Sequence, residues 1–247
     1  MLIAGLDLAA EPKGTALAVI DWSGSGAELV SLTLGIADEA IIDSVADCEK
    51  FGIDCALGWP VQFVVFLTQH ASIDGQAPEF DGGIEWRRRM AYRETDRHVR
   101  EVTGRWPLSV STDRLGMTAM RCAGLLSKLQ SSGETIDRSG AGKVVEIYPG
   151  ATLRLWGFDT SGYRASADRR SDLLGELQAR APWLNLRNHS DLMIESCDAF
   201  DSVMAALATR SAQLGQYEKP NESQLKQAQV EGWVALPTGQ LEDLNSP

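Results

Sequence analysis

Two aspartates stand in apolar segments that are typical of buried strands. Asp7 lies near the end of LIAGLDL, residues 2–8, and Asp54 interrupts GIDCALG, residues 52–58. If these segments form parallel neighbouring strands, both carboxylates lie side by side at one edge of a sheet. Burying two unpaired like charges there costs on the order of several kcal/mol. A divalent cation is the simplest compensation, because Mg²⁺ binds the oxygens of a few carboxylates.

A second carboxylate pair occurs in SCDAFDSVMAALATRSAQLG, residues 196–215, which has the pattern of an amphipathic helix. Asp198 and Asp201 are three residues apart and therefore share one helix face. The alanines that follow them would let this helix lie close to a sheet. We therefore expect Asp7, Asp54, Asp198 and Asp201 to converge as catalytic residues and as ligands of Mg²⁺ or Mn²⁺. Such a set could support two-metal cleavage of a phosphodiester.

Each carboxylate also has a purely structural interpretation. Asp7 could cap the turn that follows it, and Asp198 could be the N-cap of its helix. Asp54 is harder to explain in this way, because it interrupts an apolar strand. Glu146, in KVVEIYPG, is also predicted to lie within a strand. It could line the same site and contact substrate, or it could pair with an arginine, and the sequence does not separate these roles.

The elements that must position these residues follow a recognisable order. Three strands separated by short turns are predicted over residues 2–8, 15–22 and 27–35, and this spacing favours antiparallel pairing. A helix over residues 38–50 then leads to the strand that contains Asp54, which we expect to lie parallel to the first strand. A helix over 116–131 precedes a fifth strand at 143–150. The prediction is an α/β fold with a mixed sheet, three antiparallel strands then two parallel strands, and flanking helices.

Residues 60–115 do not fit a simple crossover and are predicted to form a helical insertion after the fourth strand. A loop is expected over residues 70–83, followed by a basic helix over about 84–103. In this helix, Arg89, Arg93, Arg97 and Arg100 are spaced to share one face and could hold phosphate groups. The alternative is an ordinary solvated face, because acidic residues are interleaved with these arginines.

Composition limits the remaining possibilities. The 247 residues are 44% hydrophobic, which is enough for one domain over residues 1–237, and residues 238–247 are predicted to be a flexible tail. No apolar segment approaches the length of a membrane span, so we expect a cytoplasmic protein. The net charge of −11 argues against binding nucleic acid through overall charge. The four scattered cysteines indicate neither a zinc site nor a disulfide framework.

Several segments together resemble the family called domain of unknown function 429, which is regarded as ribonuclease-H-like and as predicted nucleases. These segments are GLDLA, GIDCALGWP, RETDRHVRE, VVEIYPGATLRLWG, DAFDSVMAALATR and EGWVALP. The resemblance implies a ribonuclease-H-like fold and favours substrate contacts by Arg93 and Arg97. The acidic pattern is also similar to that of the RuvC resolvases, which implies metal binding by Asp7, Asp54, Asp198 and Asp201. RuvC has the longer Glu at the position of Asp54, which could alter the metal spacing.

Three functions are compatible with these observations. The first is a metal-dependent nuclease or phosphodiesterase that acts on nucleic acid or another phosphodiester. The second is a small phosphotransferase of the actin-like superfamily, which Asp7, Gly14 and Thr15 weakly resemble. The third is a binding module that kept the ribonuclease-H-like fold without catalysis. A metal titration separates the first two functions from the third.

Overall fold

The computed structural model describes residues 1–72 and 82–245. The described strands are β1 (Leu2–Asp7), β2 (Ala16–Asp21), β3 (Ala27–Leu34), β4 (Lys50–Asp54), β5 (Val144–Glu146) and β6 (Leu184–Asn185). The described α-helices are α1 (Asp38–Asp47), α2 (Val61–Ala71), α3 (Gly83–Ala91), α4 (Glu94–Thr103), α5 (Gly116–Ser131), α6 (Pro149–Leu155), α7 (Ala167–Arg180), α8 (Ser190–Glu195), α9 (Cys197–Gln213) and α10 (Glu222–Glu231). Two short 3-10 helices are η1 (Pro12–Gly14) and η2 (Leu241–Asn245). Within the described ranges, no helix combines the length and apolar character needed to cross a membrane.

The strands form one mixed sheet in the order β5-β4-β1-β2-β3-β6. The neighbours β1, β2 and β3 are antiparallel, whereas β4 is parallel to β1 and β5 is parallel to β4. This confirms the predicted α/β class and the predicted arrangement of three antiparallel strands followed by two parallel strands. The two-residue strand β6 was not predicted and pairs in parallel with β3 at the other edge.

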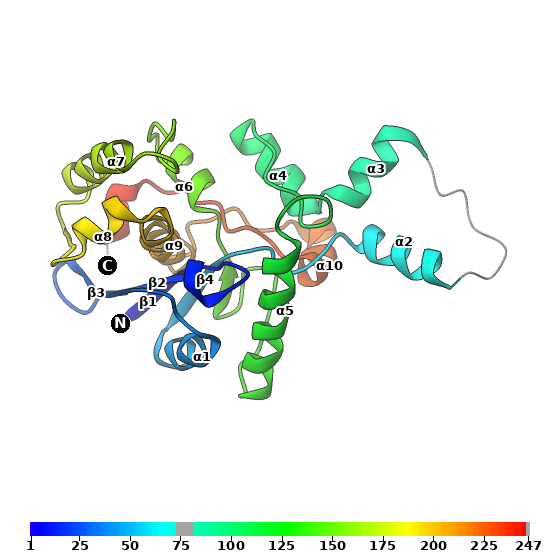
Figure 1. The fold of residues 1–247 in the computed structure, drawn as a ribbon, viewed down its shortest axis with the longest axis horizontal. Helices are drawn as coiled ribbons and strands as arrows, with labels where there is room; N and C mark the ends of the chain where they lie inside the picture. The colour runs from blue at the N-terminus through cyan, green and yellow to red at the C-terminus, as the bar shows by residue number, and fades with distance from the viewer. Residues whose placement is uncertain (73–81, 246–247) are drawn as a thin grey trace.

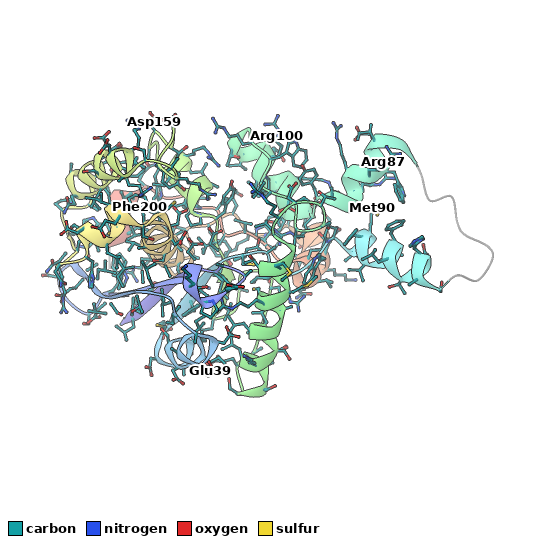
Figure 2. All side chains as sticks on the ribbon, viewed as in Figure 1. Glu39, Arg87, Met90, Arg100, Asp159 and Phe200 are labelled. Carbon is teal, nitrogen blue, oxygen red and sulfur yellow. The ribbon has the colours of Figure 1, made fainter. Side chains whose placement is uncertain are left out.

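Helix α9 lies across one face of the sheet and packs closely on β1, β2 and β4 (Figure 1). Two glycines make this close approach possible. A Cβ atom added at Gly5 of β1 would overlap the backbone of Ala206, and one added at Gly52 of β4 would overlap the Thr209 side chain. Figure 2 shows Phe200 of α9 in the interior, where it is fully buried. The predicted close packing of this helix is therefore present.

Two hydrophobic cores cover the two faces of the sheet. Ile3 of β1 belongs to the core under α9, together with Phe200. Leu6 belongs to the core on the other face, which α1 and α5 close with side chains that include Ile41 and Leu125. Fully burying an apolar side chain of this size stabilises a fold by about 1.5–3 kcal/mol. Both faces of β1 are thus fixed, and this holds the end of the strand in place.

The predicted continuous basic helix over residues 84–103 is wrong, because the structure divides it into α3 and α4. Tyr92 and Arg93 between them have extended backbone, with ψ angles of 132° and 166°. Figure 2 shows Arg87 and Met90 of α3 on an arm that projects from the sheet together with α2. The predicted loop over residues 70–83 lies mostly outside the described residues, and its first two residues belong to α2.

The predicted flexible tail is also wrong over residues 238–245. Leu241 and Leu244 of η2 are fully buried in the core under α9. The Trp156 indole nitrogen donates a hydrogen bond of 3.1 Å to the Gly239 carbonyl oxygen. Because the two leucines are three residues apart, one 3-10 turn is enough to place both in the core. Residues 246–247 lie outside the described part of the chain.

Candidate active site

The ends of two parallel strands bring the first two carboxylates together. In the register between β1 and β4, Asp7 and Asp54 are direct Cα partners at the last position of each strand. Both side chains are partly exposed at the edge of the sheet. The predicted juxtaposition of Asp7 and Asp54 is therefore present, and it follows from the parallel pairing.

Helix α9 supplies the third and fourth carboxylates from above the sheet. The Ser196 hydroxyl caps the start of α9 by accepting a hydrogen bond of 3.2 Å from the Ala199 backbone nitrogen. The helix therefore begins with Asp198 in its first turn, and Asp201 follows one turn later. Asp201 is 3% exposed, whereas Asp198 is only half-buried. Asp198 is inside the helix and is not its N-cap, so the capping interpretation does not apply to it.

All four aspartates line one pocket of about 420 Å³. Glu146 and Arg164 line it as well, and apolar side chains such as Leu108 form part of its wall. A larger hollow of about 590 Å³ lies beside Lys50, at the opposite end of β4, and contains none of the predicted site residues. The described chain thus brings the predicted carboxylates into one cavity rather than spreading them over its surface.

Burial and mutual repulsion make these carboxylates hard to ionise together. Burial, and then the Asp54, Asp201 and Asp198 carboxylates, raise the pKa of Asp7 well above its usual range. Burial and the Asp201 carboxylate raise the pKa of Asp54 to about 8. Burial also raises the pKa of Asp198. A group of carboxylates that repel one another in this way gains stability from any cation that binds among them.

Asp201 differs from the other three because it has polar partners. The Tyr163 hydroxyl donates hydrogen bonds of 3.0 Å and 3.3 Å to its two oxygens. The Arg164 guanidinium lies 3.6 Å from Asp201 Oδ2, and the Cys197 thiol donates to the same oxygen at 3.7 Å. Burial raises the pKa of Asp201 to about 6, although Arg164 and Tyr163 act in the opposite direction.

Asp7, Asp54 and Asp198 all keep carboxylate oxygens available to a cation, and two of them, Asp7 and Asp54, lie side by side at the end of the parallel strands. No hydrogen bond or ion pair joins either side chain to another residue within the described ranges. Oxygen donors of this kind suit Mg²⁺ or Mn²⁺. However, no three His, Cys, Asp or Glu side chains in residues 1–72 and 82–245 are grouped closely enough to hold a metal ion. The donor type fits a divalent ion, but a complete set of ligands is not preassembled.

Glu146 both lines the pocket and pairs with an arginine, whereas its contact with substrate stays a prediction. It lines the pocket, and it also forms a buried ion pair with Arg93, with an Nη2–Oε1 distance of 2.7 Å. Its Oε2 accepts a hydrogen bond of 3.1 Å from the Leu57 backbone nitrogen. Burial raises the pKa of Glu146, although the Arg93 charge opposes this effect. Glu146 therefore fixes the chain after β4 as well as facing the cavity.

The structure gives Arg93 a role different from the predicted substrate contact. An arginine has five N–H donors. Arg93 uses them on Asp96, on Glu146 and on the Glu231 carbonyl oxygen, and its side chain is 5% exposed. It has no donor left for a phosphate. Arg97 is paired with Glu94 at 3.1 Å and does not line the pocket, so its substrate contact stays a prediction.

Tyr163 and Arg164 are the site residues that sequence reasoning missed. They lie in SGYRASAD, between α6 and α7, where neither hydrophobic periodicity nor a known motif draws attention. Burial alone would lower the pKa of Arg164, but Tyr163 and Asp201 outweigh it and raise this pKa. Only the folded chain brings this loop to α9, so no local signal could have identified the pair.

Comparison with known proteins gives one match. The sequence profile described as "Protein of unknown function (DUF429)" matches residues 5–224. Searches of curated proteins and of solved structures find no significant match. The matched range includes every candidate site residue, from Asp7 to Asp201. Because the profile covers most of the 247 residues, this chain belongs to the DUF429 family.

Proposed function

We propose that this protein is a divalent-cation-dependent phosphodiester hydrolase with a ribonuclease-H-like fold, acting on nucleic acid. The observation that carries the proposal is the pairing of Asp7 with Asp54 at the ends of parallel strands. Both carboxylates face a pocket that Asp201 closes from α9. Within the described residues neither forms an ion pair, and the nearby Arg164 charge only partly offsets the rise of their pKa values, so a bound ion would relieve their repulsion.

Asp7 and Asp54 would hold Mg²⁺ or Mn²⁺, with Asp201 and Asp198 as further ligands. A bound divalent ion polarises a phosphoryl oxygen and lowers the pKa of a bound water, which is the chemistry that phosphodiester hydrolysis requires. Because Asp201 is held by Tyr163 and Arg164, it would have to turn away from them to join the ion. Arg164 would then offer its charge to the substrate.

The fold supports the same proposal. Three antiparallel strands followed by two parallel strands are the order expected of the ribonuclease-H-like fold. An aspartate on the first strand, an acid on the fourth strand and an Asp-x-x-Asp pair on the last long helix resemble the RuvC pattern. One fold can host many functions, and in this chain it is the carboxylates that favour phosphodiester hydrolysis.

The phosphotransferase alternative relies on Thr15 as a phosphate contact. Thr15 is fully buried. Its hydroxyl donates to the Glu11 carbonyl oxygen at 3.0 Å and accepts from Arg121 Nη1 at 2.6 Å. These contacts leave little access for a nucleotide phosphate. The binding-module alternative predicts the same fold without turnover, and an activity assay decides between it and the hydrolase.

The test is cleavage of labelled single-stranded, duplex and branched DNA and RNA in the presence of Mg²⁺, Mn²⁺ or EDTA. We expect cleavage with an ion and none in EDTA. Asp7→Asn and Asp54→Asn should reduce the rate at least about a hundredfold. Asp43→Asn, which removes an exposed carboxylate of α1 outside the pocket, is the matched control and should retain activity. Absence of cleavage of every substrate with either ion would contradict the hydrolase and favour the binding module.

A further inference from the structure

A second pocket adjoins the carboxylate pocket and has the opposite charge. It has a volume of about 320 Å³ and lies between α6, the loop before α7 and the residues that follow α4. Tyr148 and Arg164 line both pockets. A ligand that enters the second pocket therefore lies beside Arg164, whose guanidinium contacts Asp201 at 3.6 Å. We call this second cavity the arginine pocket.

The charge of the arginine pocket is unusual in this chain. Arg105, Arg154 and Arg164 line it, and no aspartate or glutamate does. The chain as a whole has 34 acidic and 23 basic residues. Within the described residues, neither Arg105 nor Arg154 forms an ion pair. Three guanidinium groups around one small cavity repel one another, and an anion bound among them would remove this repulsion.

The N–H donors of Arg154 in the arginine pocket also have few hydrogen-bond partners. Arg154 Nε is buried and has no hydrogen-bond partner in the described part of the chain. Arg154 Nη2 makes only a long bond of 3.5 Å to the Tyr148 hydroxyl. The side chain of Arg164 is 56% exposed, so it can turn toward a ligand. Guanidinium groups bind the oxygens of a phosphate through paired, charge-assisted hydrogen bonds.

We infer that the arginine pocket binds a phosphate group of the substrate backbone, next to the phosphodiester that the carboxylate pocket would cleave. This inference rests on the proposed hydrolase function and identifies where the substrate is held. It also explains how a chain with a net charge of −11 can bind a polyanion, because the positive charge is concentrated beside the site. The arginines of α3, on the projecting arm, play no part in it.

The test measures binding of inorganic phosphate by ³¹P NMR in EDTA, so that it needs neither a metal ion nor cleavage. Arg105→Gln and Arg154→Gln should each weaken phosphate binding at least about tenfold. Arg89→Gln removes the same charge from an exposed site on α3 and should leave binding unchanged. Arg105 is exposed as well, so Arg105→Gln tests the pocket even if Arg154→Gln fails to fold.

A short single-stranded DNA oligonucleotide, added in the same buffer, distinguishes a substrate phosphate from a free anion. The inference predicts that the oligonucleotide displaces inorganic phosphate, and that Arg105→Gln weakens both ligands. Phosphate binding that the oligonucleotide cannot displace would overturn the substrate role. Binding that is equal in the wild type, Arg105→Gln and Arg154→Gln would overturn the site itself. Asp7→Asn should retain phosphate binding even if it abolishes metal binding, so the two proposals can fail separately.

Discussion

Asp54 is the residue at which electrostatics and stability are most directly linked. Burial and the Asp201 carboxylate raise its pKa to about 8 in the folded chain, whereas an unfolded aspartate has a pKa of about 3.9. Between these values the folded state binds a proton that the unfolded state has released. The free energy of unfolding therefore falls as the pH rises through this window.

Asp54→Asn should remove this fall in the free energy of unfolding with rising pH. In EDTA, we expect the variant to be more stable than the wild type, by at least about 1 kcal/mol at pH 8, and the difference should shrink toward pH 4. Urea unfolding at a series of pH values measures this difference in the free energy of unfolding. Asp43→Asn is the control and should show no such dependence. If the variant is less stable than the wild type at pH 8, burial and the Asp201 charge do not destabilise the ionised Asp54 carboxylate as described.

Substitution of Arg93 should have the opposite effect on stability. Removing one partner of a buried ion pair leaves an uncompensated charge and typically costs about 3–5 kcal/mol. Arg93→Ala should therefore strongly destabilise the chain in urea, because Asp96 and Glu146 lose their cation. Arg97→Ala, which breaks a more exposed pair with Glu94, should cost less than about 1 kcal/mol. Equal effects of the two substitutions would contradict the structural role of Arg93.

The sequence was more informative about carboxylates than about arginines, for a physical reason. An aspartate that ends or interrupts an apolar strand stands out from its immediate sequence neighbours, so Asp7 and Asp54 could be identified from their own segments. The role of Arg93 depends on Glu146 and Glu231, which lie far away in sequence. No local pattern reveals such partners. Tyr163 and Arg164 were missed for the same reason.

At the level of the elements, the contact between α9 and β1 controls the position of Asp201. A Cβ atom at Gly5 would overlap backbone atoms of Ser202 and Ala206. Gly5→Ala should therefore push α9 away from the sheet and destabilise the chain by about 1–3 kcal/mol, as overpacking does in other cores. It should also weaken divalent-ion binding, because Asp201 would move with the helix.

Gly124→Ala in α5 is the matched control for Gly5→Ala. Gly124 has open space where its Cβ atom would lie, and alanine is the better helix former. Gly124→Ala should leave the chain equally stable or stabilise it by up to about 1 kcal/mol, as thermal unfolding will show. If Gly5→Ala is as stable as the wild type, the close packing of α9 does not determine the position of Asp201.

The elements themselves were predictable where the pattern was local. Strands β1 to β5 and helix α9 follow from apolar runs and turns in the sequence. The break between α3 and α4 was not predictable, because the helical spacing of the arginines continues across it. Arg93 has an extended backbone there, and its buried ion pairs depend on distant residues. Tertiary contacts therefore override the local helical preference at the break between α3 and α4.

For the whole molecule, the two adjacent pockets explain how an acidic chain could act on a polyanion. The carboxylate pocket would concentrate cations, and the arginine pocket would hold phosphate beside them. The predicted tail could not be recognised as part of the fold, because Leu241 and Leu244 are buried by α9 and other distant elements. The predicted cytoplasmic location, by contrast, stays a prediction.

The central claim is that Asp7 and Asp54 bind a divalent ion, and a Mn²⁺ titration followed by electron paramagnetic resonance tests it most directly. At pH 8, where protons compete less for these carboxylates than they do at neutral pH, the wild type should bind at least one Mn²⁺ ion. Asp7→Asn and Asp54→Asn should each weaken binding at least about tenfold, whereas Asp43→Asn should bind like the wild type. No binding at millimolar Mn²⁺, or equal binding by the wild type, Asp7→Asn and Asp54→Asn, would contradict the claim.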